Sequence, residues 1–397
     1  MESLRHLYRI GIGPSSSHTM APQSAAKMYL KRHPEAQAFD VTLYGSLAAT
    51  GKGHMTDVAI LRVLESQGSV DLHWEPRIRL PYHPNAMRFA VKEPDGSLSD
   101  EWTVYSIGGG ALSEGPNDHV EHRTIYPDTT MDEIIQWCHD TGCSLWEYVE
   151  KYEDAEIWDY LRRVWQVMQE AVERGIDHEG VLPGPLGLQR KAPIYHTKAK
   201  GYKANLQSSG LVYAYALAVS EENASGGIIV TAPTCGSCGV LPAVLYHLGH
   251  NHAFSEERIL HALATAGLIG NLAKHNASIS GADVGCQGEV GVASAMAAAA
   301  ACQLFGGSVN QIEYAAEMGL EHHLGMTCDP VCGLVQIPCI ERNAFAAARA
   351  LDANFYASLS DGQHRVSFDR VLRVMKQTGH DLPSLYKETS EGGLAKL

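Results

Sequence analysis

Residues 276–304 read NASISGADVGCQGEVGVASAMAAAAACQL, a glycine-containing polar loop followed by a run of small apolar residues. From Val290 to Leu304 there is no proline, and alanine is the commonest residue. Such a segment predicts a buried helix that neighbouring helices can approach closely. The preceding loop carries Cys286 to the start of that helix, so a cysteine site is predicted beside the centre of a helical domain.

The rest of the sequence after residue 200 keeps this helical, small-residue character. Apolar residues recur at helical separations, and acidic residues open the segment that follows Ser255. We expect residues 201–397 to form an all-α catalytic bundle. Its further helices are predicted over residues 211–220, 255–274, 310–322, 341–351 and 366–378.

The first part of the chain alternates strand-like and helix-like segments. A strand with period-two alternation is predicted over Val41–Ser46, and helices are predicted over Met20–Lys31 and Met55–Leu64. Further β-like segments are RIRLPY (77–82), MRFAVKE (87–93) and WTVYSI (102–107), the last two joined by a turn at Asp95-Gly96.

These patterns predict an α+β fold with two domains, as the length of 397 residues also suggests. An N-terminal α/β open-sheet domain is expected over residues 1–150. A helical connection and linker over residues 151–200 includes the Gly- and Pro-rich segment EGVLPGPLGLQRKA (179–192). The all-α domain follows over residues 201–397.

The composition of the chain excludes some classes of binding partner. The net charge is −14 and no cluster of Lys and Arg is present, which argues against nucleic acid and anionic membranes. No apolar stretch reaches the length of a bilayer span, and the N-terminus has no signal-peptide core, so a cytoplasmic protein is expected. Hydrophobic residues make up 45% and charged residues 19% of the chain, which favours a homo-oligomer, with a homodimer as the expectation.

The nine cysteines favour thiolate chemistry or core filling over a disulfide framework. Cys286, Cys328 and Cys339 lie in segments that are predicted to be loops at helix ends, whereas Cys302 lies within a helix. Soft thiolates select zinc, copper(I) or iron–sulfur clusters. A competing set combines the CxxC pair Cys235 and Cys238 with Cys328 and Cys332, as in a structural zinc site or a redox module. The residues alone leave both sets open.

Two loops carry candidate polar groups. GIGPSSSHT (11–19) precedes a predicted helix and offers hydroxyls and backbone N–H groups to an anion, although simple helix capping by one serine is the alternative. GSLAATGKGHMTD (45–57) follows the predicted strand and presents His54. A single histidine is more often structural than catalytic, but histidine titrates near neutral pH and can serve as a base.

Several segments, spread from residue 11 to residue 344, resemble the iron–sulfur-dependent L-serine dehydratases (L-serine ammonia-lyases) in family order. They are GIGPSSSHT, VTLYGSLAATGKGHMTD, SIGGG, EGVLPGPLGLQRKA, NASISGADVGCQGEVGVASAMAAAA and EHHLGMTCDPVCGLVQIPCIERNA. The ending YKETSEGGLA fits as well. The resemblance therefore covers essentially the whole chain.

The resemblance implies that L-serine is converted to pyruvate and ammonia. It places Cys286, Cys328 and Cys339 at the ligand positions of a [4Fe-4S] cluster whose open iron acts as a Lewis acid toward a small amino-acid substrate. His54, and after it His18, are the expected catalytic bases. Ser16, Ser17, Thr19, Asn276 and Ser278 are expected to hold the substrate. The N-terminal half resembles the family's β domain, which is similar to a regulatory substrate-binding domain of some phosphoglycerate dehydrogenases.

The chain departs from the family pattern at two places. It ends in GGLAKL without the late cysteine that can occupy the open iron in some members, and it reads PTCGSCG (233–239) where many members read PTNGA. Three alternatives stay open: L-threonine or L-cysteine as substrate, a pyridoxal-phosphate enzyme with Lys203 as the anchor, and a non-catalytic zinc or redox thiolate module.

Overall fold

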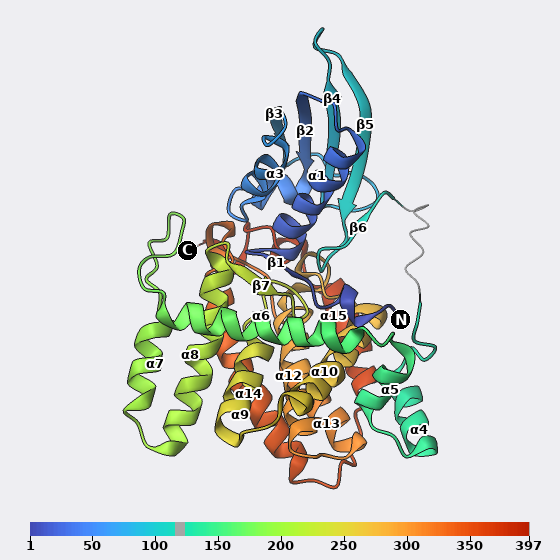
Figure 1. The fold of residues 1–397 in the computed structure, drawn as a ribbon, viewed down its shortest axis with the longest axis vertical. Helices are drawn as coiled ribbons and strands as arrows, with labels where there is room; N and C mark the ends of the chain where they lie inside the picture. The colour runs from blue at the N-terminus through green and yellow to red at the C-terminus, as the bar shows by residue number, and fades with distance from the viewer. Residues whose placement is uncertain (116–123, 397) are drawn as a thin grey trace.

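The structure, a computed structural model, describes residues 1–115 and 124–396. A small sheet domain stands on a larger helical body, as Figure 1 shows. Each part has its own cluster of buried hydrophobic residues. The predicted fold class, an N-terminal α/β open-sheet domain followed by an all-α bundle, is confirmed.

The open sheet has five strands in the order β3-β2-β4-β5-β6. Strands β2 and β3 are parallel, and the other neighbouring pairs are antiparallel. Helices α1 and α3 pack on one face, where Tyr29 and Ile60 join Phe39 and Val41 of β2 in the smaller hydrophobic cluster. The elements are α1 (Ala21–Arg32), β2 (Ala38–Tyr44), α2 (Gly45–Thr50), α3 (Thr56–Leu64), β3 (Ser69–Glu75), β4 (Ala86–Lys92), β5 (Leu98–Ser106) and β6 (Leu112–Ser113).

One predicted strand of this domain is absent, and two elements of it were not predicted. RIRLPY forms no strand, because Pro76 and Pro81 flank or interrupt it and cannot donate to a sheet ladder. The edge strand β3 was missed, although its inward residues Val70, Leu72 and Trp74 alternate with exposed ones. The segment GSLAAT after β2 is the short helix α2 rather than an open turn.

The helical body is built around α12 (Val290–Leu304), which packs against α9, α10, α13 and α14. Around these lie η1 (Leu4–His6), α4 (Met131–Thr141), α5 (Leu145–Tyr152), α6 (Ile157–Asp177), α7 (Ala192–Lys200), α8 (Ala204–Ala224), α9 (Val240–His252), α10 (Glu256–Asn276), α11 (Gly281–Val284), η3 (Gly285–Gln287), α13 (Val309–Glu321), η4 (Val331–Gly333), α14 (Cys339–Ser358), α15 (Phe368–Asp381), η5 (Ser384–Tyr386) and η6 (Gly393–Lys396).

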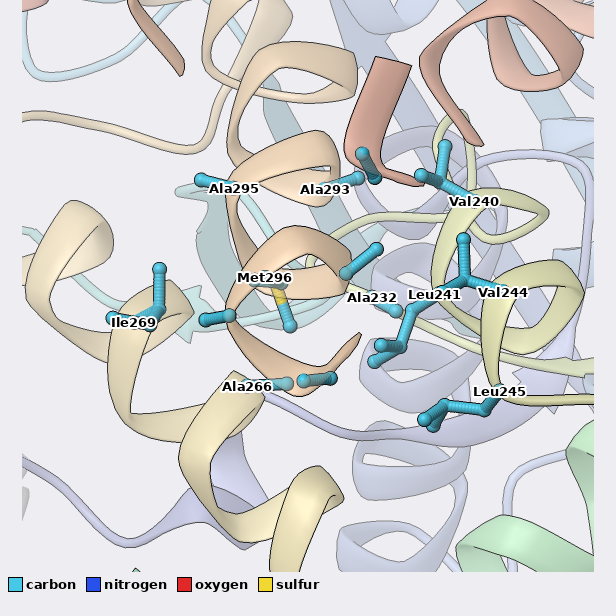
Figure 2. Packing of buried hydrophobic residues seen from close by; sticks show 14 of the residues in the cluster. Ala232, Val240, Leu241, Val244, Leu245, Ala266, Ile269, Ala293, Ala295 and Met296 are labelled. Atoms are coloured by element: carbon cyan, nitrogen blue, oxygen red, sulfur yellow. The ribbon is translucent and has the colours of Figure 1, made fainter. Parts of the chain in front are cut away.

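The small residues of α12 allow the close packing that the sequence predicts. Figure 2 shows Ala293, Ala295 and Met296 lying between residues of α9 and α10. All but one of the residues of α12 are buried. The loop that carries Cys286 runs directly into this helix, so the most tightly packed element of the body fixes one end of the candidate site.

Helices α7 and α9 were not predicted. The predicted linker is partly helical, because Pro193 occupies a first-turn position of α7, where its missing N–H costs nothing. Helix α9 follows the CxxC segment, and its residues Val240 to Leu248 are all buried. A helix that is buried on all sides has no amphipathic period, so its sequence carries no periodic signal of a helix.

The N-terminus is part of the helical body. Leu4, Leu7 and Tyr8 belong to the larger cluster, and the Tyr8 hydroxyl donates to the Leu263 carbonyl at 2.9 Å. Strand β1 (Ile10–Ile12) pairs antiparallel with β7 (Ile228–Val230). Helices α4 and α5 also pack in the larger cluster. The domain limits given from the sequence stay a prediction.

In the part of the chain that the structure describes, no helix has both the length and the apolar character needed to cross a membrane.

Candidate active site

Three cysteines from separate segments meet where the sheet domain rests on the helical body. Cys286 lies in η3 just before α12, Cys328 lies in the loop after α13, and Cys339 is the first residue of α14. The backbone holds the first two in place, since Cys286 N–H donates to the Met326 carbonyl at 3.0 Å and Cys328 N–H donates to the Tyr386 carbonyl at 2.8 Å. We call these three residues the three-thiol site.

The thiols of this site influence one another electrostatically. Burial, and then the neighbouring acidic groups, raise the pKa of Cys328 and of Cys339 well above the ordinary range. Burial also raises the pKa of Cys286, to about 11, while the nearby Arg342 guanidinium acts in the opposite direction. The Arg342 guanidinium only partly offsets burial, so these raised pKa values favour protonated thiols at pH 7.

Arg342 is the cation of the three-thiol site. It follows Cys339 by one turn of α14, and its guanidinium donates to the Thr327 carbonyl at 2.7 Å and lies 3.4 Å from the Asp329 carboxylate. Burial opposes its charge, but Cys286 and Cys339 outweigh this effect and raise its pKa. It thus ties the loop of Cys328 to the helix of Cys339.

Two glutamates border the same site. Glu289 accepts a hydrogen bond from the Thr234 hydroxyl at 2.7 Å, and its other oxygen lies 4.0 Å from the Cys328 sulfur. Its pKa is raised by burial. Glu388, on the C-terminal segment, is 8% exposed, and its pKa is raised to about 8 by burial and then by Glu289 and Asp283. The site therefore contains more acidic groups than bases.

The two predicted bases lie side by side, with ring centroids 4.6 Å apart. His18 is fully buried, and its Nδ1 and Nε2 lie 2.8 Å and 3.1 Å from the hydroxyls of Ser17 and Ser46. His54 is 1% exposed, and its Nδ1 has no hydrogen-bond partner among the described residues. Burial lowers the pKa of His54 to about 4 and that of His18 well below its usual value, so both rings are neutral at pH 7.

The serine-rich loop folds into a short π-helical turn, η2 (Ser16–Met20), which places His18. Ser15, which sequence analysis did not select, caps this turn by accepting from the His18 N–H at 3.1 Å. The Thr19 hydroxyl donates to the His54 carbonyl at 2.6 Å and links the two histidine segments. The Ser17 and Thr19 hydroxyls thus already have protein partners, whereas no described partner contacts the hydroxyl of the buried Ser16.

Asn276 and Ser278 make different contacts: Asn276 binds backbone carbonyls and Ser278 binds a carboxylate. The Asn276 amide donates to the Thr129 and Leu272 carbonyls at 2.7 Å and 3.0 Å, so it anchors the end of α10. The Ser278 hydroxyl donates to Asp283 at 3.0 Å. Asp283 in turn influences the charge of Glu388. Ser278 therefore reaches the three-thiol site through a carboxylate, and a direct substrate contact by either residue stays a prediction.

The cysteines of the competing set lie in different environments. Cys235 and Cys238 are buried, and the Cys235 sulfur lies 3.3 Å from the Met20 sulfur in the core. Burial raises the pKa of both thiols. Cys332 is exposed and has a left-handed backbone, with φ of 55°. These environments do not favour one zinc ion held by Cys235, Cys238, Cys328 and Cys332.

Within residues 1–115 and 124–396, no three or more His, Cys, Asp or Glu side chains are arranged to hold one metal ion. The three sulfurs of the three-thiol site are therefore also not arranged around a single ion. A multi-iron cluster, however, takes each thiolate on a different iron, so its ligands need not converge on one point.

Glu289, Arg342, Glu388 and Ser46 were missed in the sequence analysis. Two of them were detectable: Glu289 follows Cys286 by three residues, and Arg342 follows Cys339 by one helical turn. Nothing in the sequence brings Glu388 to His18, although the carboxylate lies 3.8 Å from the ring Nδ1. Ser46 likewise comes to His18 only in the folded chain, where its hydroxyl lies 3.1 Å from the ring Nε2.

Comparison with known proteins gives two family matches. The family model described as "Serine dehydratase alpha chain" matches residues 49–395, and "Serine dehydratase beta chain" matches residues 3–69. The L-serine dehydratase of Streptomyces coelicolor is 42% identical, with 99% of this chain and 98% of that protein covered. L-serine dehydratase 1 of Escherichia coli is 41% identical over 100% of this chain and 99% of that protein. The L-serine dehydratase of Helicobacter pylori is 36% identical, with 99% and 98% covered.

Proposed function

The chain belongs to the serine dehydratase family, as a single polypeptide with both the alpha- and beta-chain regions, and from that premise we propose that it converts L-serine to pyruvate and ammonia. The proposal is carried by three thiols that influence one another electrostatically and by a neutral histidine pair that Glu388 links to them. The Glu388 carboxylate lies 3.8 Å from His18 Nδ1, and the Glu388 N–H donates to the Cys328 carbonyl at 2.7 Å. The names of relatives that are about 40% identical over their full length support the same substrate.

The three-thiol site fits a [4Fe-4S] cluster better than a single ion. Its donors are soft sulfurs carried by three separate segments, a chemistry that selects iron–sulfur clusters among other soft metals. The surplus of acidic groups around Cys328 is what a positively charged iron core would compensate. Cys286, Cys328 and Cys339 would hold the cluster. When bound, the cluster supplies a Lewis-acidic iron that makes hydroxide a better leaving group.

His54 is proposed as the base that removes the α-proton. Its Nδ1 is buried and has no partner among the described residues, so a lone pair is available, whereas both ring nitrogens of His18 lie near serine hydroxyls. Burial lowers the pKa of His54 to about 4, which keeps the ring in the unprotonated form that a base needs at pH 7, although a lower pKa also makes it a weaker proton acceptor. His18, fixed by Ser17 and Ser46, is the second candidate.

In this proposal the protein catalyses one step, the elimination of water from L-serine. As the base takes the α-proton, the electrons of the Cα–H bond form the Cα=Cβ double bond, and hydroxide leaves and is protonated to water. The aminoacrylate that results tautomerises and hydrolyses to pyruvate and ammonia. The substrate carboxylate is expected near η2, where the hydroxyl of Ser16 has no described partner and N–H groups open the turn.

The pyridoxal-phosphate alternative receives no support from Lys203. This residue is exposed at the N-cap of α8, whereas a Schiff-base lysine is activated by desolvation in a pocket. The small fraction of charged residues supports a homodimer, and the cytoplasmic location stays an expectation from the sequence.

The test is anaerobic purification with counts of iron and acid-labile sulfide, followed by pyruvate assays with L-serine, L-threonine and L-cysteine. We expect iron and sulfide in equal amounts, near four of each per chain, and pyruvate from L-serine. Zinc without iron would reject the cluster. Turnover of L-threonine or L-cysteine in preference to L-serine would reject the proposed substrate.

A further inference from the structure

Glu388 lies on the C-terminal segment that follows η5. The segment is pinned beside the three-thiol site, since Cys328 N–H donates to the Tyr386 carbonyl at 2.8 Å and Glu388 N–H donates to the Cys328 carbonyl at 2.7 Å. Glu388 has a left-handed backbone, with φ of 57°, which is unfavourable for a residue other than glycine. The surrounding bonds impose this conformation, and it turns the side chain inward: Glu388 is buried, whereas Lys387 and Thr389 are partly exposed.

The Glu388 carboxylate has no strong partner. Its nearest possible cation is His18, whose Nδ1 lies 3.8 Å away and is shared with Ser17. No hydrogen-bond donor and no Lys or Arg is paired with this carboxylate in the described part of the chain. Its other charged neighbours, Glu289 and Asp283, are acidic themselves. The raised pKa of Glu388 reflects this lack of a cation, and a positively charged ligand beside the carboxyl group would favour its ionised form.

The neighbouring carboxylates, unlike that of Glu388, accept hydrogen bonds from protein hydroxyls among the described residues. Glu289 already accepts from the Thr234 hydroxyl at 2.7 Å, and Asp283 accepts from the Ser278 hydroxyl at 3.0 Å. Glu388 is therefore the carboxylate of the site that is free to receive a ligand, and it lies between His18 and the thiols.

L-serine presents three polar groups to the protein. In the proposed function, its carboxylate and hydroxyl are accounted for, but its α-ammonium group has no partner. An ammonium group that enters a buried site needs a negatively charged acceptor. We propose that Glu388 binds the α-ammonium group of the amino-acid substrate. This inference rests on the proposed function and adds the residue that selects amino acids over acids without an amino group.

The assignment also agrees with the geometry of the elimination. A carboxylate 3.8 Å from His18 would hold the substrate nitrogen next to the histidine pair. The α-carbon, which is bonded to that nitrogen, would then lie within reach of the base. Glu388 thus acts by binding the substrate rather than by transferring the α-proton.

The test compares E388Q with wild type and with E391Q, which alters an exposed glutamate of the same segment. Each protein is prepared anaerobically with its iron and sulfide counted. Two ligand pairs differ only in the ammonium group: L-serine against 3-hydroxypropionate, and L-alanine against propionate. The KM of L-serine and the inhibition constant of 3-hydroxypropionate are measured in the pyruvate assay, and L-alanine and propionate are titrated by calorimetry.

We expect E388Q to raise the KM of L-serine and the Kd of L-alanine by about tenfold or more, as loss of one charge-assisted hydrogen bond implies. Binding of 3-hydroxypropionate and propionate should change little, and E391Q should match wild type. E388D, which keeps the charge, should recover part of the affinity for L-alanine.

Equal weakening of both members of a pair, or unchanged binding of L-alanine, would overturn the proposal. Loss of iron from E388Q would also overturn it, because Glu388 would then support the cluster and not the substrate. The proposed function fails separately, if wild type makes no pyruvate from L-serine. The calorimetric comparison does not depend on that outcome.

Discussion

Replacing Gly319 by alanine should weaken the contact between α12 and α13, on which the position of the Cys286 loop depends. A Cβ at residue 319 would lie 2.9 Å from both the N and Cα atoms of Ala295 and 3.0 Å from the Ser294 carbonyl carbon. These are backbone atoms of α12, so no side-chain rotation relieves the clash and the two helices must separate.

The magnitude follows from two opposing effects. Alanine is favoured over glycine inside a helix by about 1 kcal/mol. Overpacking of a close-packed core costs about 1–3 kcal/mol, and the backbone contact here places G319A toward the upper end. We therefore expect G319A to lower the free energy of unfolding by about 1–2 kcal/mol.

Gly249 of α9 supplies the matched control. Both glycines lie near the C-terminal end of a 13-residue helix, but a Cβ at residue 249 would meet only the Ile259 Cδ1 atom, at 3.7 Å. G249A should raise the free energy of unfolding by about 0.5–1 kcal/mol through helix propensity. Urea unfolding followed by circular dichroism measures both variants. If G319A proves as stable as G249A, the packing argument is refuted.

The remaining predictions concern the site and its pH dependence. C286A should abolish the brown absorbance of anaerobically prepared protein, whereas C302A, which alters a thiol inside α12, should keep it; a C286A protein with full iron content would contradict the ligand assignment. H54A should lower kcat by about 10²–10⁴-fold with the absorbance intact, while H178A, at the exposed end of α6, should not; undiminished turnover of H54A would exclude His54 as the base. Because the pKa of His54 is lowered to about 4, the unfolded chain binds the proton first, so stability should be fully present above pH 6.5 and lost as the pH falls toward 4, by about 3 kcal/mol. H54Q should show a shallower loss in urea unfolding across this window, and an equal slope in both proteins would count against a neutral buried His54.

The sequence predicted features that depend on local pattern. The alanine-rich run from Val290 to Leu304 is helix α12 with the predicted limits, because alanine has the highest helix propensity and no proline interrupts the run. The turn at Asp95-Gly96 is present as well, with Gly96 at φ of 83°. Elements without a clear period were missed, as with the wholly buried α9, or misplaced, as with the proline-bounded RIRLPY.

The sequence by itself determined which residues could carry chemistry: the loop cysteines, the two histidines and the serine-rich turn each stand in a distinctive local context. Only the tertiary structure decided how these groups are used. It joins the Ser17 and Ser46 hydroxyls to His18, leaves Nδ1 of His54 without a described partner, and directs Asn276 to the backbone of Thr129 and Leu272. It also brings Glu388 from the end of the chain to within 3.8 Å of His18 near its start. The physical reason is that burial and long-range contacts set charge and availability, and neither is encoded in the spacing of residues along the chain.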